Sequence, residues 1–108
     1  MPRPVLLTGD AFADLDEVVG HIARQDSPAK ARQVFQRIRV AVTSLADSPE
    51  RGAYPPELSA LGIRVYRELF FKPYRIVYRV LPDAVLVMLI ADGRRDMQSL
   101  LQRRLLEP

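Results

Sequence analysis

The chain contains no cysteine, which excludes a disulfide framework, a thiolate metal site and a cysteine nucleophile. It contains a single histidine, His21, so a metal site with several histidine ligands is impossible and a Ser–His catalytic pair is disfavoured. His21 lies next to Gly20 in a predicted helix, where we expect a structural, partly exposed side chain rather than a catalytic one. We therefore expect no bound metal.

The common catalytic and nucleotide-binding motifs are also missing. The sequence has no Gly-rich phosphate loop, GxSxG elbow, HExxH pair or dinucleotide fingerprint. This absence excludes the enzyme classes that carry those motifs, and we expect no cofactor.

Long hydrophobic segments and linkers are absent as well. The longest apolar run, residues 84–91, has the length of a strand and is far below the roughly 18 residues of a membrane span. The N-terminus lacks the apolar region of a signal peptide, so we expect a cytoplasmic protein. No repeat, low-complexity tract or linker divides the 108 residues, which predicts one domain, 1–108.

The positive charge is concentrated in the second part of the chain. Residues 1–62 carry seven Lys and Arg against eight Asp and Glu, whereas residues 63–108 carry nine against five. The formal net charge of +3 therefore arises after residue 62, which indicates an anionic partner, either nucleic acid or an acidic protein segment. Fourteen of the sixteen basic residues are arginine, so a GC-rich genome is an alternative explanation.

The first half predicts a short edge strand at 5–8 and two amphipathic helices. Asp10 is the expected N-cap of the first helix, which should fade between residues 24 and 26. Ser27 and Pro28 signal the second helix, which should reach about Ala46. The turn between the two is short, so they should form an antiparallel hairpin. The expected apolar faces are Phe12, Leu15, Val18 or Val19 and Ile22, followed by Ala31, Val34, Phe35, Ile38, Ala41 or Val42 and Leu45.

The second half predicts three antiparallel strands, at 63–71, 74–81 and 84–91. A symmetric turn at Lys72-Pro73 would place Leu69 opposite Ile76 and Val65 opposite Val80, although a proline in the turn could shift this register. The strand at 84–91 is apolar on both faces, which indicates a central position.

The last predicted element is a short helix that begins after Asp96, its expected N-cap. Met97, Leu100, Leu101 and Leu105 form its apolar stripe, with Arg103 and Arg104 alongside. The complete pattern predicts an α+β fold, in which a helical hairpin packs on a small antiparallel sheet made of a three-strand meander and an N-terminal edge strand.

The side chains that remain as candidates for a functional site are cationic and aromatic. Arginines can stabilise a phosphorane-like transition state, and a tyrosine or glutamate could act as acid or base in RNA cleavage. For each residue taken singly a structural interpretation is favoured over the catalytic one, because Glu68 can pair diagonally with Arg75 across the hairpin and Tyr78 can lie in the core. The residues of this group are Tyr66, Arg67, Lys72, Tyr74, Arg75, Tyr78, Arg79, Arg94 and Arg95.

Two N-terminal helices, the segment YRELFFKPYRIVYRV, an apolar strand ending in GRRD and a helix with QRRL together resemble the RelE/ParE toxin superfamily. These are the toxins of type II toxin–antitoxin modules, often called plasmid stabilisation proteins. The resemblance covers nearly the whole chain. It implies a hetero-oligomer with an acidic antitoxin wrapped around the toxin, and we expect antitoxin contacts along the helical hairpin and the sheet edge, at Leu15, Val19, Phe35 and Arg79.

RelE-like members are ribosome-dependent endoribonucleases that cut mRNA with basic residues and a C-terminal tyrosine or histidine. The resemblance would assign catalysis to Arg67, Arg75 and Arg95. The chain departs from that set, because Leu101 stands where the tyrosine is expected and Leu69 where a second basic residue is expected. Asp92 also replaces a histidine common in relatives. An RNase with this set would lack its expected general acid.

ParE-like members lack the catalytic set and instead trap DNA gyrase in its cleaved complex with DNA. The missing tyrosine favours this branch, in which the chain would be a gyrase inhibitor without an enzymatic active site. The last helix and its preceding arginines would then form the effector surface, with Arg94, Arg95, Arg103 and Arg104. A non-toxic member that survives as part of a repressor complex is a third possibility.

Overall fold

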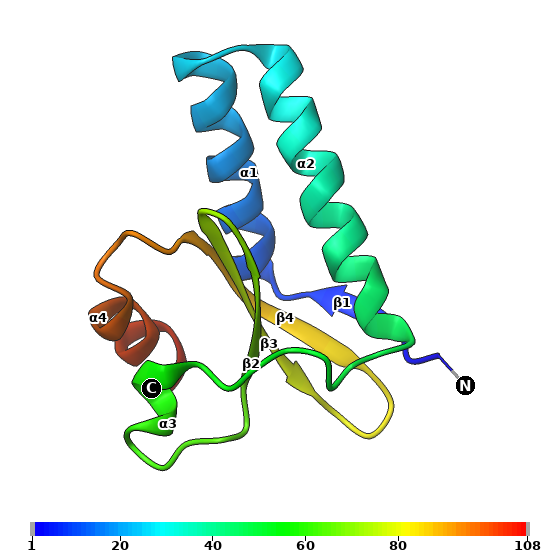
Figure 1. Cartoon of the computed structure of the whole chain (residues 1–108), viewed down its shortest axis with the longest axis vertical. Helices are drawn as coiled ribbons and strands as arrows, with labels where there is room; N and C mark the ends of the chain where they lie inside the picture. Colours follow the sequence, from blue (N-terminus) through cyan, green and yellow to red (C-terminus); the bar gives the residue numbers. More distant parts are fainter. Residues whose placement is uncertain (1, 108) are drawn as a thin grey trace.

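The structure, a computed structural model, describes residues 2–107 and has the α+β architecture that the sequence predicts (Figure 1). Two long helices form a hairpin on one face of the sheet, and short helical segments lie against the other face. The helical elements are α1 (Gly9–Gln25), α2 (Pro28–Thr43), a 3-10 turn (Ser44–Ala46), α3 (Pro56–Ser59), α4 (Met97–Leu101) and a π-helical turn (Gln102–Leu106).

Within residues 2–107 four strands form one sheet in the order β1-β4-β3-β2. The edge strand β1 pairs parallel with β4, and β2, β3 and β4 form the antiparallel meander. β4 is therefore central, as its apolar sequence predicts, but the sheet is mixed rather than antiparallel. The strands are β1 (Val5–Leu7), β2 (Arg67–Phe71), β3 (Tyr74–Val80) and β4 (Val85–Asp92).

Hydroxyl and carboxylate caps start the main helices. Ser27 Oγ accepts from the Lys30 amide at 3.0 Å, and Asp96 Oδ1 accepts from the Ser99 amide at 3.2 Å, which confirms two predicted N-caps. The prediction of Asp10 as the first cap is wrong. Thr8 Oγ1 accepts from the Ala11 amide at 3.1 Å, so α1 begins two residues earlier than expected.

The register of the β2–β3 hairpin agrees with the symmetric turn. Leu69 pairs with Ile76 and Arg67 with Tyr78, around a tight turn with a cis Lys72–Pro73 bond. The predicted start of this strand at residue 63 is wrong, as is the Val65–Val80 pair, because β2 begins at Arg67 and Val65 is 54% exposed. The Ile63 amide donates to Leu58 O, so the chain before β2 is held by α3 instead of by β3.

The sheet is covered on both faces. Leu69, Ile76 and Tyr78 pack under the helical hairpin, whereas Tyr66 and Val77 pack with α3 and α4 on the opposite side. The sequence indicated only the first of these cores. Met97, Leu100 and Leu101 are buried in the second core, with Leu105 partly buried, which confirms the apolar stripe of the last helix. In the part of the chain that the structure describes, no helix is long and apolar enough to cross a membrane.

Candidate functional site

Arg75 in β3 lies in a cage of carboxylates. Only 8% of its surface is exposed. Its Nη1 and Nη2 donate to the two Glu57 oxygens at 2.8 and 2.7 Å, and its Nε donates to Glu68 Oε1 at 2.6 Å. These hydrogen bonds lower the pKa of Glu57 and raise the pKa of Arg75. The Glu68 partner was predicted from the hairpin, and an anionic substrate would have to displace one of these carboxylates.

Close packing continues behind Arg75 at the turn that follows β4. A Cβ on Gly93 would lie 2.9 Å from Arg75 Cδ and 3.1 Å from Pro73 O. Any side chain at this position would force the arginine stem or the Pro73 carbonyl to shift, so glycine suits the close approach of the backbone. These contacts connect Arg75 to α3, β2 and the end of β4, which gives the arginine a structural role.

Arg67 anchors the loop before α3. Its Nη1 donates to Gly52 O at 2.8 Å and to Glu50 O at 3.3 Å, and its Nη2 donates to Tyr54 Oη at 3.1 Å. The guanidinium carbon also lies 4.5 Å from the centre of the Tyr54 ring. The neighbouring Tyr78 is fully buried, and its hydroxyl accepts from the Gly52 amide at 3.0 Å. Burial raises the pKa of Tyr78, so the hydroxyl stays neutral and holds the same loop.

The three arginines expected for RNA cleavage do not converge. Strand alternation places Arg67 on the same face as Leu69, which packs under the helical hairpin. Arg75 contacts Glu68 on the opposite face. Leu101, at the position of the expected tyrosine, is fully buried in the second core.

Arg95 lies apart from both, in a cleft of about 330 Å³ between α1 and the ends of β3 and β4. Tyr74 and His21 also line this cleft. Burial, and then the charge of Asp92, raises the pKa of Tyr74. Among residues 2–107 Arg95 has no hydrogen bond or ion pair from its side chain, whereas the neighbouring Arg94 is paired with Asp92 at 2.6 Å and is exposed.

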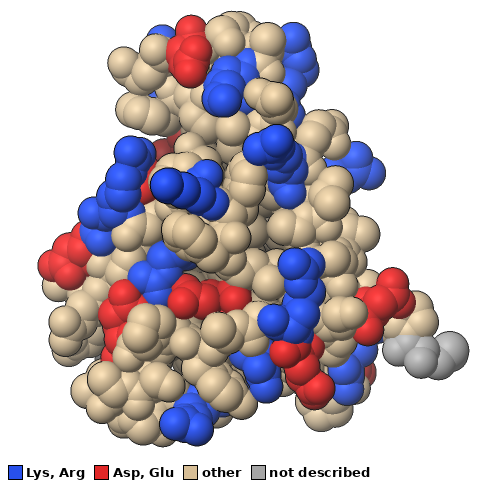
Figure 2. All heavy atoms as spheres, in the orientation of Figure 1, with Lys and Arg blue, Asp and Glu red and all other residues tan. Residues whose placement is uncertain are grey.

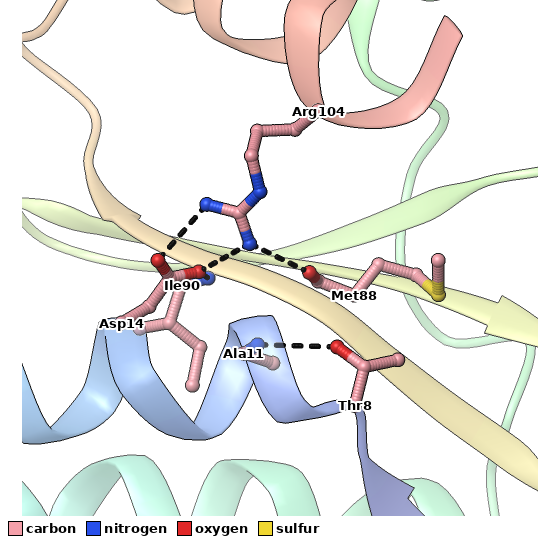
Figure 3. A network of polar contacts seen from close by, with 6 residues as sticks. All are labelled: Thr8, Ala11, Asp14, Met88, Ile90 and Arg104. Carbon is pink, nitrogen blue, oxygen red and sulfur yellow. Dashed lines mark hydrogen bonds and ion pairs between the residues drawn. The ribbon is translucent and has the colours of Figure 1, made fainter. Parts of the chain in front are cut away.

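Arg104 attaches the C-terminal segment to the sheet (Figure 3). Its Nη1 and Nη2 donate to the two Asp14 oxygens at 2.9 Å each, and Nη2 donates to Met88 O at 3.2 Å. Asp14 Oδ2 also accepts from the Ile90 amide at 3.1 Å. The strand β1 pairs with β4 only as far as Val87, so this ion pair occupies the β4 edge just beyond the last β1 partner. Arg104 therefore positions the segment on which the exposed Arg103 lies.

Three of the four residues expected to bind an antitoxin form a shallow groove of about 110 Å³ on the helical hairpin. Leu15, Val19 and Phe35 line it together with Phe12, which is 66% exposed. Phe12 and Phe35 were expected on the apolar faces of their helices, but both are exposed, and the fully buried Ala11 packs in the core instead. Arg79 is exposed and lies elsewhere, in a hollow that it shares with Arg64 and Arg67.

Sequence reasoning missed the groups that hold these arginines. Asp14 precedes Arg104 by 90 residues, and Glu57 precedes Arg75 by 18, so no local pattern links either pair. Asp14 carried only the general signal of a carboxylate in the first turns of a helix.

No group of three His, Asp or Glu side chains that could hold a metal occurs in the described range.

Comparisons with known proteins agree with this fold. The family model of the ParE toxin of type II toxin–antitoxin systems, parDE, matches residues 5–97. A structure described as the chromosomal ParDE toxin–antitoxin system from P. aeruginosa is 25% identical with a TM-score of 0.70, over 83% of this chain and 95% of that chain. The toxin–antitoxin complex RelBE2 from Mycobacterium tuberculosis is 19% identical with a TM-score of 0.55, over 85% and 92%, and indicates the fold alone. No curated protein sequence matches.

Proposed function

The chain belongs to the ParE toxin family of type II toxin–antitoxin systems, and from this membership we propose that it inhibits DNA gyrase in the cytoplasm by trapping the cleaved gyrase–DNA complex. A cognate acidic antitoxin neutralises it in a hetero-oligomeric complex. Under this proposal the protein acts by binding and has no enzymatic active site.

The carboxylate cage of Arg75 is the observation that supports the gyrase branch. An RNase of the RelE type needs free cationic groups around the scissile phosphate, because they stabilise the charge of the transition state. Here Arg75 is neutralised by Glu57 and Glu68. Arg67 lies on the opposite face of the sheet, and Leu101 is buried where a tyrosine would be required.

The proposed effector surface consists of the exposed arginines around α4, namely Arg94, Arg95 and Arg103. Arg104 contributes by positioning, since it is bound to Asp14 and Met88. Cationic side chains at this end of the molecule would contact either acidic groups of gyrase or the phosphates of the trapped DNA.

The proposed antitoxin site begins at the helical hairpin. The groove of Phe12, Leu15, Val19 and Phe35 presents apolar side chains at helical spacing, which suits the apolar face of an amphipathic partner helix. An acidic continuation of the same partner would reach Arg79. The hollow around Arg79 also contains Arg64 and Arg67 against one carboxylate, Glu50, so its net positive charge complements an acidic segment.

Ribosome-dependent mRNA cleavage is a second candidate because of the cleft at Arg95. That cleft contains Tyr74 and His21, either of which could act as the general acid that the C-terminal helix lacks. The enzyme reading then predicts that Tyr74→Phe or His21→Gln abolishes toxicity without unfolding the protein.

A gyrase cleavage assay with purified protein tests the proposal. Gyrase, supercoiled plasmid and the full chain are incubated, and linear protein-linked DNA is measured after detergent and protease treatment. We expect linear DNA to accumulate with the wild type and to decrease strongly with Arg95→Ala/Arg103→Ala. Arg32→Ala/Arg39→Ala, an equal charge change on exposed residues of α2, is the matched control and should retain activity.

The absence of linear DNA at every toxin concentration, together with mRNA cleavage on purified ribosomes, would overturn the gyrase proposal. Substitutions are preferable to truncation in this assay. Trimming the chain after Asp96 would remove Met97, Leu100 and Leu101 from the second core, so the loss of activity could reflect unfolding.

A further inference from the structure

A groove runs between α2, the end of α1 and the β2–β3 hairpin, along a face of α2 that differs from the face carrying Phe35. It consists of two adjoining hollows of about 370 and 480 Å³, which share Arg37 and Phe71. Neither the effector surface nor the antitoxin groove includes these residues. The α2 side chains that line it are Lys30, Gln33, Val34, Gln36, Arg37, Val40, Ala41 and the adjacent Ser44.

The groove carries a strong excess of positive charge. Lys30, Arg37, Arg51 and Lys72 line it, and Asp26 is the one acidic side chain among its described lining residues. Lys30, Arg37 and Ser44 recur every seven residues, so they follow one side of α2 for about 20 Å at 1.5 Å per residue. On the face shown in Figure 2, basic side chains predominate over the helical hairpin and the β2–β3 turn.

Aromatic rings lie among these cations. The guanidinium carbon of Arg37 is 5.5 Å from the centre of the Phe71 ring, and the centres of the Phe71 and Tyr74 rings are 6.2 Å apart. Both rings are partly exposed and line the groove. A guanidinium that lies over a ring face keeps its N–H groups pointing outward in its own plane, where they can donate to an anion.

We propose that this groove binds single-stranded nucleic acid, with the phosphodiester backbone on Lys30, Arg37, Arg51 and Lys72 and bases stacked at Phe71 and Tyr74. A basic groove interleaved with aromatic rings is the arrangement that binds single strands without sequence preference. The amides of Gln33 and Gln36 add donors and acceptors for base edges. An amphipathic antitoxin helix fits the apolar groove of Phe12 and Phe35 better than this polar one.

The salt dependence of binding tests the proposal. Fluorescence anisotropy would follow the full chain with labelled oligo(dT) and oligo(rU) of about 12 nucleotides, at roughly 50 to 300 mM salt. Four phosphates bound at about 0.7 per phosphate give a slope near −3 for the logarithm of affinity against the logarithm of salt concentration. Arg37→Gln/Lys72→Gln should reduce the magnitude of this slope by about 1.4 and weaken binding at low salt by about tenfold or more.

Arg32→Gln/Arg39→Gln is the matched control, since it removes two charges from another face of the same helix and should leave the slope unchanged. The thermal melts of all variants verify folding. Equal affinity for oligo(dT) and oligo(rU) would mean that the groove recognises the phosphodiester backbone and the bases. A preference for one of them would identify the bound nucleic acid as DNA or RNA.

Three results would overturn the proposal. These are no binding at the lowest salt, equal losses in the two double variants, or equal competition by an oligo-glutamate of matched charge, which would indicate an acidic peptide. The assay contains no gyrase and no ribosome, so its outcome is separate from that of the gyrase proposal; Tyr74 and His21 also line the Arg95 cleft of the second candidate function.

Discussion

Replacing Arg75 with alanine separates a structural role of this arginine from a catalytic one. The substitution leaves the carboxylates of Glu57 and Glu68 close together without their counter-ion, with side chains that are 24% and 13% exposed. It also empties the space over Gly93 that the arginine stem occupies. Both effects destabilise the folded state and neither acts in the unfolded chain.

The size of the effect follows from burial. Removing one partner of a buried ion pair costs about 3 to 5 kcal/mol, and the partial exposure of Glu57 favours the lower end, about 3 kcal/mol. With an unfolding entropy of about 2.1 cal/mol/K per residue, the 108 residues give roughly 0.23 kcal/mol/K. The melting temperature should therefore fall by about 13 °C.

Differential scanning calorimetry of the purified chain measures this shift. Arg95→Ala is the control, because Arg95 is exposed, and it should change the melting temperature by less than about 2 °C. Combining Arg75→Met with Glu57→Gln and Glu68→Gln should recover at least about half of the loss, since no unpaired charge remains. An unchanged melting temperature with complete loss of toxicity in Arg75→Ala would refute the structural assignment and return Arg75 to the chemistry.

The hydrogen bonds with Arg75 lower the pKa of Glu57 from its ordinary value of 4.5. The pair therefore stabilises the fold above that pH, and the stabilisation is lost as the pH falls through the folded pKa. When the melting temperature is measured at decreasing pH, it should decline less in Arg75→Ala than in the wild type. Asp14→Asn should cost about 1 to 3 kcal/mol in urea unfolding, and adding Arg104→Gln should cost little more, because both act on one ion pair; additive losses would contradict this. Phe12→Ser should weaken antitoxin binding by about tenfold in calorimetric titration with little change in melting temperature, since two-thirds of Phe12 is exposed; undiminished binding would move the antitoxin away from the hairpin groove.

Features of the fold that depend on neighbouring residues could be predicted from the sequence. The hairpin register around Lys72-Pro73 and the caps at Ser27 and Asp96 are local, and all three agree with the structure. The prediction of the first N-cap was wrong because Thr8 and Asp10 both offer an acceptor near the start of α1. Which of them caps the helix depends on where β1 ends. The predicted start of β2 was wrong because the contact of Ile63 with α3 cannot be inferred from a strand pattern.

The candidate site could be predicted less well, because its arginines have partners from distant parts of the chain. The diagonal pairing of Arg75 with Glu68 follows from the hairpin, but the bidentate contact with Glu57 requires the placement of α3. Arg104 was expected on the effector surface with its neighbours. Its ion pair with Asp14 depends on how far β1 extends along β4, which sequence periodicity does not determine.

The most direct test of the central claim is pulse labelling after induction of the toxin in a bacterial host without the antitoxin. Thymidine and methionine incorporation are followed in parallel over the first minutes. The gyrase proposal predicts that thymidine incorporation stops while methionine incorporation continues and the cells grow into filaments. A prompt stop in methionine incorporation would contradict it and would identify mRNA cleavage as the activity.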